Sequence, residues 1–317
     1  MISASRGNRV MLLLLLYKFL IGIVFPPIIR SFGVNIDFVS AVLLTQTVAF
    51  FVPFVVYLLL TKQRVGDVLM FKRLSLKNII LIAVMVYSLS PVAMLLSFIS
   101  SLFANNYIAE IMQGVAPTVP LWGLLIAIGI TPSVMEELMF RGVIYNEYKY
   151  INIRNAALVN GLFFGLMHMN LQQFFYAAFL GFIFTYFLYY TKSILAPMLA
   201  HFFLNGSQVT LLYLALNHVG QEAAYTYELG EMEAIEAPSP FVTIIVLGVL
   251  CLVFIPLFIF AWREFVATNR HNVEKHDEVD VEIIEDDGTI LEEKKQPILT
   301  MSFWAVIAFY LVYVLVL

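Results

Sequence analysis

Residues 132–142 read PSVMEELMFRG, and this stretch places two adjacent glutamates and an arginine inside an apolar run. An α-helix turns about 100° per residue, so Glu137 and Arg141, four residues apart, share a face and can form an ion pair. Glu136 points away from that pair, and we expect it to face a cavity as a free carboxylate. Pro132 lies four residues before Glu136 and interrupts the helical hydrogen bonds there, which leaves backbone groups for water or substrate.

The composition around this stretch is that of a membrane protein. Of the 317 residues, 61% are hydrophobic and 13% are charged, and the mean hydropathy is +0.89. A soluble domain has about a quarter charged residues and could not bury so much apolar surface. The single cysteine, Cys251, excludes a disulfide framework. Membrane residence is therefore the reading that the composition favours.

Apolar runs long enough to cross the hydrocarbon of a bilayer recur along the chain. They predict an all-α fold, a polytopic transmembrane helical bundle of about nine spans, because each span needs roughly 20 apolar residues. The fifth run is short for a span. The predicted spans cover residues 10–29, 38–60, 79–103, 119–139, 155–169, 171–190, 194–216, 241–262 and 300–317.

The spans and loops divide the chain into N-terminal helices with an interfacial amphipathic segment, a polar core and C-terminal spans. These parts cover residues 1–114 with the segment at 61–78, residues 115–216, and residues 217–317. The last part contains an acidic outer loop at 218–240 and a cytoplasmic insert at 263–299 with eleven acidic and five basic side chains. Alternation around Asp287-Gly288 in the insert fits either a small hairpin or a solvated loop.

Basic residues predict the orientation of the chain in the membrane. If the N-terminus is cytoplasmic, all 18 Lys and Arg residues except Lys18, Arg30 and Arg141 fall in inner segments. Cytoplasmic loops of membrane proteins carry such an excess of Lys and Arg. We therefore expect an integral membrane protein with its N-terminus cytoplasmic and its C-terminus outside. The same bias favours a bacterial plasma membrane, with the endoplasmic reticulum as the alternative.

Ionisable residues inside spans indicate the functional site, because charges in hydrocarbon are costly and usually mark a pathway or a site. Glu136 and Glu137 are the only acidic residues within the apolar spans, and His168 and His201 are the only histidines deep in them. The three spans that carry these residues are close in sequence and can converge in one bundle.

Two further spans repeat the spacing of four residues. Phe164 and His168 share a face in NGLFFGLMH, and His201 and Asn205 share a face in APMLAHFFLN. Gly161 and Gly165 in the first of these runs allow a neighbouring helix to approach closely. We interpret Phe164, together with Glu137 and Arg141, as a supporting residue that shapes the pocket.

Such a set of side chains can hydrolyse a peptide bond. A carboxylate near an imidazole in a poorly solvated pocket can take a proton from water, so Glu136 and His168 are the candidate base. His201 and Asn205 are candidate neutral hydrogen-bond donors to the oxyanion. No serine or cysteine lies beside a histidine in these spans, which disfavours covalent catalysis. A cavity that opens to one leaflet or to the cytoplasm would admit water and a substrate segment.

The three motifs together resemble those of the CAAX protease and bacteriocin-processing family, the intramembrane glutamate proteases related to type II CAAX prenyl endopeptidases. The motifs are Glu136-Glu137-x-x-x-Arg141, Phe164-x-x-x-His168 and His201-x-x-x-Asn205. The resemblance covers about residues 115–216. It implies an eight-helix-type membrane core, here with an extra C-terminal span, in which Glu136 and His168 activate water and His201 and Asn205 bind the oxyanion without a metal. It also implies prenylated, bacteriocin-like or signalling peptides as substrates.

Other readings of the same residues remain. Glu136, His168 and His201 are acceptable zinc ligands with an open fourth position, although the chain has no HExxH motif. A non-enzymatic immunity or scaffold protein, or a proton-coupled transporter, could also bury such groups. The favoured reading requires no cofactor and no nucleic acid, and its partners are membrane lipid and a peptide or protein substrate that enters a membrane cavity.

Overall fold

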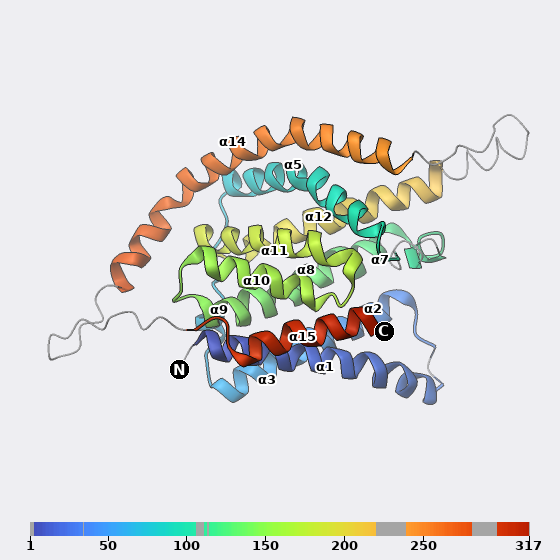
Figure 1. Cartoon of the computed structure of the whole chain (residues 1–317), viewed down its shortest axis with the longest axis horizontal. Helices are drawn as coiled ribbons and strands as arrows, with labels where there is room; N and C mark the ends of the chain where they lie inside the picture. The colour runs from blue at the N-terminus through green and yellow to red at the C-terminus, as the bar shows by residue number, and fades with distance from the viewer. Residues whose placement is uncertain are drawn as a thin grey trace, which may run out of the picture.

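The computed structural model describes residues 3–33, 35–105, 111–112, 114–219, 239–280 and 297–316, and within them the regular elements are all helices (Figure 1). Some helices continue through π-helical segments, labelled η. In chain order the elements are α1 (Ala4–Ser31), α2 (Phe38–Gln46), η1 (Thr47–Phe51), α3 (Val52–Thr61), α4 (Val65–Val68), α5 (Leu76–Ser101), α7 (Leu121–Leu124), η2 (Leu125–Ile130), α8 (Thr131–Glu137), η3 (Leu138–Ile144), α9 (Tyr145–Tyr148), α10 (Ile153–Met167), α11 (Leu171–Thr191), α12 (Leu195–Leu214), η4 (Ala215–Val219), α14 (Pro240–Asp280) and α15 (Met301–Val316).

The predicted polytopic all-α fold is confirmed. In the part of the chain that the structure describes, seven helices are long and apolar enough to cross a membrane, and two shorter apolar helices, α10 and α15, accompany them. Residues 38–61 form one of the seven as α2, η1 and α3, and residues 121–148 form another as α7 to α9. The nine predicted apolar runs thus correspond to nine helical segments of the described residues, and the short fifth run is α10.

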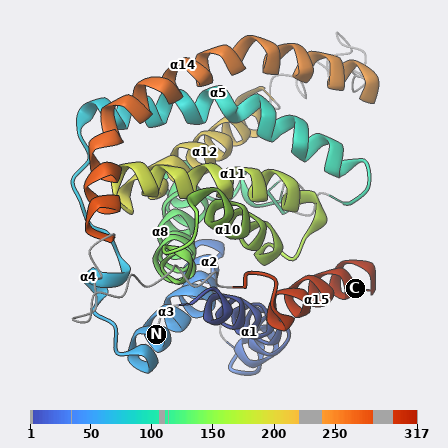
Figure 2. The ribbon, with the colours of Figure 1, turned by 60° about the vertical axis from the view of Figure 1, so that its left-hand side comes forward.

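Helices α10 and α11 form the centre of the bundle, with α8 and α12 beside them (Figure 2). A Cβ atom on Gly161 would lie 2.6 Å from the carbonyl oxygen of Ala178, and one on Gly165 would lie 2.7 Å from that of Phe174. Both distances are too short for any side chain other than hydrogen. The predicted close approach at these two glycines is therefore confirmed, and it brings the backbones of α10 and α11 into contact.

Helices α5 and α14 lie along one side of the bundle, and α1 and α15 lie along the opposite side (Figure 2). Helix α14 continues to Asp280, so the first part of the predicted insert, residues 263–280, is helical. The polar extension is held against α5, because Asn78 and Asn269 exchange hydrogen bonds of 3.0 and 2.8 Å and Lys77 pairs with Glu264 at 3.4 Å. The hairpin proposed around Asp287 lies outside the described residues, as does most of the acidic loop at 218–240.

The segment at 61–78 holds a single four-residue helix, α4, which is shorter than the amphipathic helix expected there. Val68 and Leu69 are buried, and the carbonyl of Met70 accepts a hydrogen bond from the Ile194 amide at 2.7 Å. The apolar part of this segment thus packs on the protein itself, next to the start of α12.

A polar network ties the ends of α1, α3 and α9 together. The buried Glu147 carboxylate pairs with Arg6 at 2.7 Å and accepts hydrogen bonds from the Ser3 amide and the Tyr57 hydroxyl. Nearby, Asn8 donates to the carbonyl of Ile298 at 2.7 Å, which fixes the chain just before α15. These contacts collect the N-terminus and several helix ends at one end of the bundle.

Candidate active site

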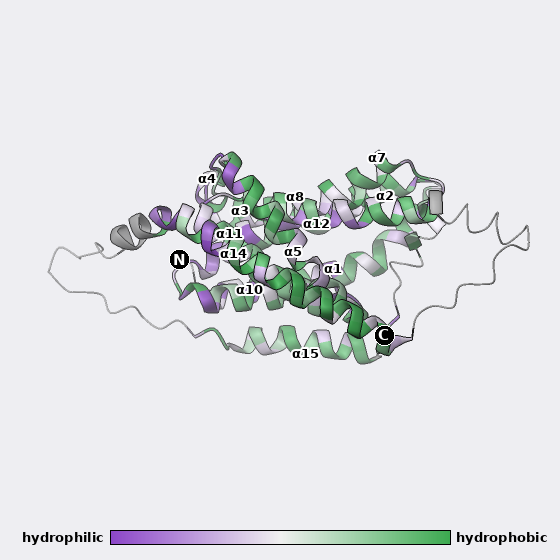
Figure 3. Cartoon of the chain, turned by 90° about the horizontal axis from the view of Figure 1, so that it is seen from above, coloured by the Kyte–Doolittle hydropathy of each residue, from purple (hydrophilic) through white to green (hydrophobic). Residues whose placement is uncertain are grey.

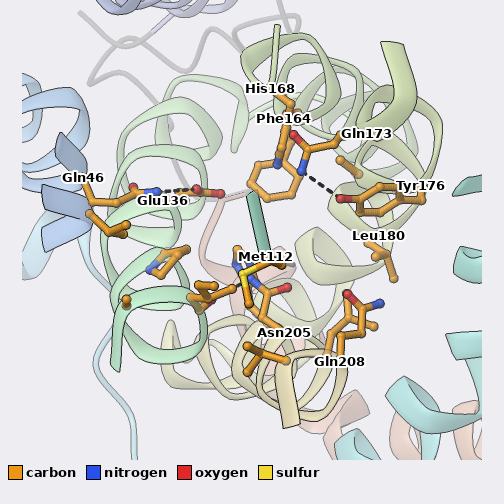
Figure 4. Close-up of a pocket in the computed structure, with 18 of the residues that line it drawn as sticks. Gln46, Met112, Glu136, Phe164, His168, Gln173, Tyr176, Leu180, Asn205 and Gln208 are labelled. Atoms are coloured by element: carbon orange, nitrogen blue, oxygen red, sulfur yellow. Dashed lines mark hydrogen bonds between the residues drawn. The ribbon is translucent and has the colours of Figure 1, made fainter. Parts of the chain in front are cut away.

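A cavity of about 440 Å³ lies between α2, η2, α8, α10, α11 and α12 (Figure 4). The structure brings all four candidate catalytic residues to its wall, together with the candidate supporting residue Phe164. The four are Glu136, His168, His201 and Asn205. They come from three helices that are separate in the sequence, so the cavity exists only because these helices pack together.

Glu136 is the carboxylate that faces the cavity. It is 8% exposed, and its Oε1 accepts a hydrogen bond from Gln46 Nε2 at 3.3 Å (Figure 4). No ion pair to Glu136 occurs among the residues that the structure describes. Its neighbour Glu137 is completely buried and does not line the cavity, because successive helical residues point in different directions.

Glu137 joins two basic side chains. Its Oε1 accepts hydrogen bonds from Arg141 Nη1 at 3.0 Å and from His201 Nδ1 at 2.9 Å. Arg141 Nη2 donates to the carbonyl of Gly181 at 2.9 Å, and the guanidinium lies 4.6 Å from the centre of the Phe164 ring. A buried charge is tolerated when it is paired, and Glu137 and Arg141 pair with each other, while Glu137 Oε2 and Arg141 Nε have no hydrogen-bond partner among the described residues.

His168 lies at the C-terminal end of α10, and its ring nitrogen Nε2 is available to accept a proton. Its Nδ1 lies 2.8 Å from the carbonyl oxygen of Phe164, and a carbonyl can only accept, so Nδ1 carries the proton. In the neutral ring Nε2 then keeps a lone pair that can accept a proton from water. The Phe164 ring meets both His168 and His201 edge to face, at centroid distances of 5.1 and 5.8 Å, and so fixes the planes of both imidazoles.

His201 and Asn205 lie on successive turns of α12. Because His201 Nδ1 donates to the Glu137 carboxylate, its Nε2 can donate to an oxyanion only in the imidazolium form. This differs from the sequence expectation of a neutral donor. Asn205 Nδ2 donates to the carbonyl of Ile128 at 3.1 Å, four residues before Pro132, which has no N–H to offer that carbonyl. The second amide hydrogen of Asn205 remains for a ligand.

Lys18 and Gln46 also line the cavity, and our sequence analysis did not assign them to it. Lys18 Nζ donates to the carbonyl of Met167 at 2.7 Å, directly before His168, and lies 5.5 Å from the centre of the Phe50 ring. The sequence contains one sign that Lys18 is unusual, because its charged ammonium group lies inside the first apolar run. Nothing in the sequence showed that α1 and α2 pack against the polar core.

The alternative of a zinc site requires three ligand side chains close to one another. Among the residues that the structure describes, no three His, Cys, Asp or Glu side chains gather as a metal-binding group. Of the three candidate ligands, His201 directs Nδ1 at Glu137 and has only Nε2 left for the cavity. That the site works without a metal stays a prediction.

Comparison with known proteins finds similarity over the same segment. Residues 118–207 match the family model described as "Type II CAAX prenyl endopeptidase Rce1-like". The chain is also 32% identical over 92 residues to "Putative membrane peptidase YdiL" of Bacillus subtilis (strain 168). That alignment covers 29% of this chain and 37% of the relative, so the chain spans well under two thirds of the relative's length. No solved structure matches the chain.

The apolar helices define an integral membrane protein, and residues 118–207 of this protein are similar to a family of membrane peptidases. The resemblance to the CAAX protease and bacteriocin-processing family, predicted from three short motifs, is confirmed over residues 118–207. All the candidate site residues fall inside this matched segment. Lys18 and Gln46, two of the lining residues that sequence analysis did not assign, fall outside it.

Proposed function

We propose that this protein is an intramembrane endopeptidase in which Glu136 and His168 activate a water molecule for attack on a peptide bond. The observation that carries this proposal is the different environment of the two adjacent glutamates. Glu137 forms an ion pair with Arg141 and contacts His201, whereas Glu136 faces the cavity with His168 and has no cationic partner within ion-pair distance among the described residues. A surplus carboxylate beside an imidazole is what general-base chemistry requires.

The reaction follows from these positions. Glu136 takes a proton from a water molecule held by His168 Nε2, and the water oxygen forms a bond to the carbonyl carbon of the substrate. The negative charge that develops on the carbonyl oxygen is stabilised by Asn205, and by His201 when its Nε2 carries a proton. When the carbon–nitrogen bond breaks, the proton on Glu136 moves to the leaving nitrogen, which restores the carboxylate.

The supporting residues hold this geometry. Arg141 is anchored on α11 through Gly181, and Glu137 links Arg141 to His201 on α12. The Glu137–Arg141 pair therefore connects its own helical span to α11 through Arg141 and to α12 through Glu137. In a cavity with little water, such fixed donors need not reorganise when charge develops in the transition state.

We propose a membrane-bound peptide or protein segment as the substrate, in a bacterial plasma membrane. The family match supports a CAAX-type peptidase, and the apolar wall of the cavity supports a membrane-associated substrate. The test compares peptides from membranes that contain the wild-type protein with those from membranes that contain Glu136→Gln, in isotopically labelled water. New peptide ends with labelled carboxylates should appear only with the wild type. Proton flux in liposomes without new peptide ends would favour the transporter instead.

A further inference from the structure

The cavity is closed on one side of Glu136 and extends away from it on the other. The span formed by α7 to α9 runs from Leu121 to Tyr148. It contributes Ala127, Ile128, Pro132 and Glu136 to the cavity wall and nothing after Glu136. Every residue from 136 to 148 is buried. The second half of this span therefore closes the cavity on that side of Glu136.

The other walls extend in the direction of the first half of that span. Helix α12 lines the cavity from His201 through Asn205 and Gln208 to Leu212, near its C-terminal end. Helix α2 lines it from Phe38, its first residue, to Gln46. Gln208 is exposed, as is the lining residue Ile111. Among the described residues, the mouth thus lies at the end of the bundle where α2 and α7 begin and α12 finishes.

The opposite end of the bundle carries the basic residues. Arg6–Glu147 joins the start of α1 to α9 there, and Lys77–Glu264 joins the start of α5 to α14. Figure 1 shows the N-terminus and α9 at that end and α7 at the other, and Figure 3 shows hydrophilic residues around α4 and the N-terminus. The described basic residues at this end are Arg6, Arg9, Lys62, Arg64, Lys72, Arg73, Lys77, Lys149, Arg154, Lys192, Arg263 and Arg270.

Lys and Arg residues accumulate on the cytoplasmic side of membrane proteins, so the basic end is the cytoplasmic one and the mouth faces the other way. We infer that the substrate reaches Glu136 from the non-cytoplasmic side of the membrane. Sequence analysis had left open a cavity that opens to the cytoplasm, and the buried second half of the span argues against that option. This inference rests on the proposed function for its substrate, but the direction of the opening can be tested alone.

The wall between the mouth and Glu136 also describes the substrate. It consists of apolar side chains such as Phe38, Val42 and Leu212, with the amides of Gln173 and Gln208 among them (Figure 4). The charged groups of the described lining are Lys18 and Glu136, and both belong to the inner end with His168. The chemistry fits an uncharged, apolar peptide segment exposed at the outer surface of the membrane.

Cysteine labelling in spheroplasts tests this inference. The only native cysteine, Cys251, is replaced by alanine, and one new cysteine is introduced as Gln208→Cys at the mouth or Arg64→Cys at the basic end. Each variant is treated with a membrane-impermeant maleimide before and after permeabilisation. We expect Gln208→Cys to be labelled equally in both conditions and Arg64→Cys to be labelled only after permeabilisation.

Labelling of Gln208→Cys only after permeabilisation would overturn the inference, and so would its failure to react in both conditions. Labelling of Arg64→Cys in intact spheroplasts would overturn the orientation on which the inference depends. The readout involves no cleavage, so it is independent of whether Glu136 is the base. Loss of peptidase activity in every assay, with the expected labelling, would leave the opening established and reject the proposed function.

Discussion

His201 Nδ1 lies 2.9 Å from Glu137 Oε1, the same oxygen that Arg141 Nη1 contacts at 3.0 Å. One carboxylate thus compensates the arginine and also sets the orientation of a cavity histidine. The motif spacing predicts the pairing within one helix, but the link to α12 connects residues 64 positions apart. Glu137 is therefore a positioning residue, distinct in its environment from Glu136.

We predict that Glu137→Gln destabilises the protein by about 3–5 kcal/mol, because it leaves the Arg141 guanidinium buried without a compensating charge. Unfolding of the purified protein in detergent measures this change. The matched control is Glu136→Gln on the neighbouring residue, which should unfold like the wild type. Equal stability of the two variants would contradict the pairing. The double variant Glu137→Gln/Arg141→Met should recover much of the lost stability, since it removes the orphaned charge.

Asn205→Ala should lower kcat by roughly a hundred- to a thousand-fold with little change in KM, because an oxyanion donor acts mainly in the transition state. Steady-state kinetics on a cleaved peptide give both values. Ser207→Ala, two residues further on the same helix and outside the cavity wall, serves as the control. An equal loss in both variants, or a change confined to KM, would show that Asn205 does not stabilise the oxyanion.

Gly161→Ala should destabilise the protein by about 1–3 kcal/mol, as expected when a methyl group is forced into a packed contact. The added Cβ would meet the Ala178 carbonyl at 2.6 Å and Phe182 N at 2.7 Å, and neither backbone group can move freely. Gly22→Ala is the control, because a Cβ there meets nothing within 4 Å. It should be neutral or stabilising by up to about 1 kcal/mol. Detergent unfolding curves that reverse this order would refute the contact between α10 and α11.

Peptidase activity should persist in a strong zinc chelator, because the proposed step uses only carboxylate, imidazole and amide groups. The initial rate of cleavage before and after chelation measures this. Loss of activity that added zinc restores would instead assign Glu136, His168 and His201 as metal ligands. The expected result is an unchanged rate.

The sequence predicted the helical spans well because length and apolar composition alone determine them. The sequence predicted residues 263–299 only as a charged cytoplasmic insert and gave no sign that α14 continues through residues 263–280. Contacts such as Asn78 with Asn269 hold this part of the helix against α5. Those contacts join residues 191 positions apart and leave no local pattern.

Part of the candidate site could also be predicted from the sequence. Spacing of four residues placed His168 and His201 on defined faces, and the cost of intramembrane charge singled out the glutamates. Lys18 and Gln46 reach the cavity only through the packing of α1 and α2, which no periodicity reveals. The two different roles of the His201 ring nitrogens likewise depend on its tertiary contact with Glu137.

The central claim is that Glu136 is the base that activates water. Its most direct test is the rate of cleavage by purified wild-type protein and by Glu136→Gln, reconstituted in equal amounts and with matched unfolding temperatures. Loss of general-base catalysis typically lowers a rate by about 10²–10⁴-fold, and we expect a decrease in that range for Glu136→Gln. A variant that cleaves at the wild-type rate would contradict the account.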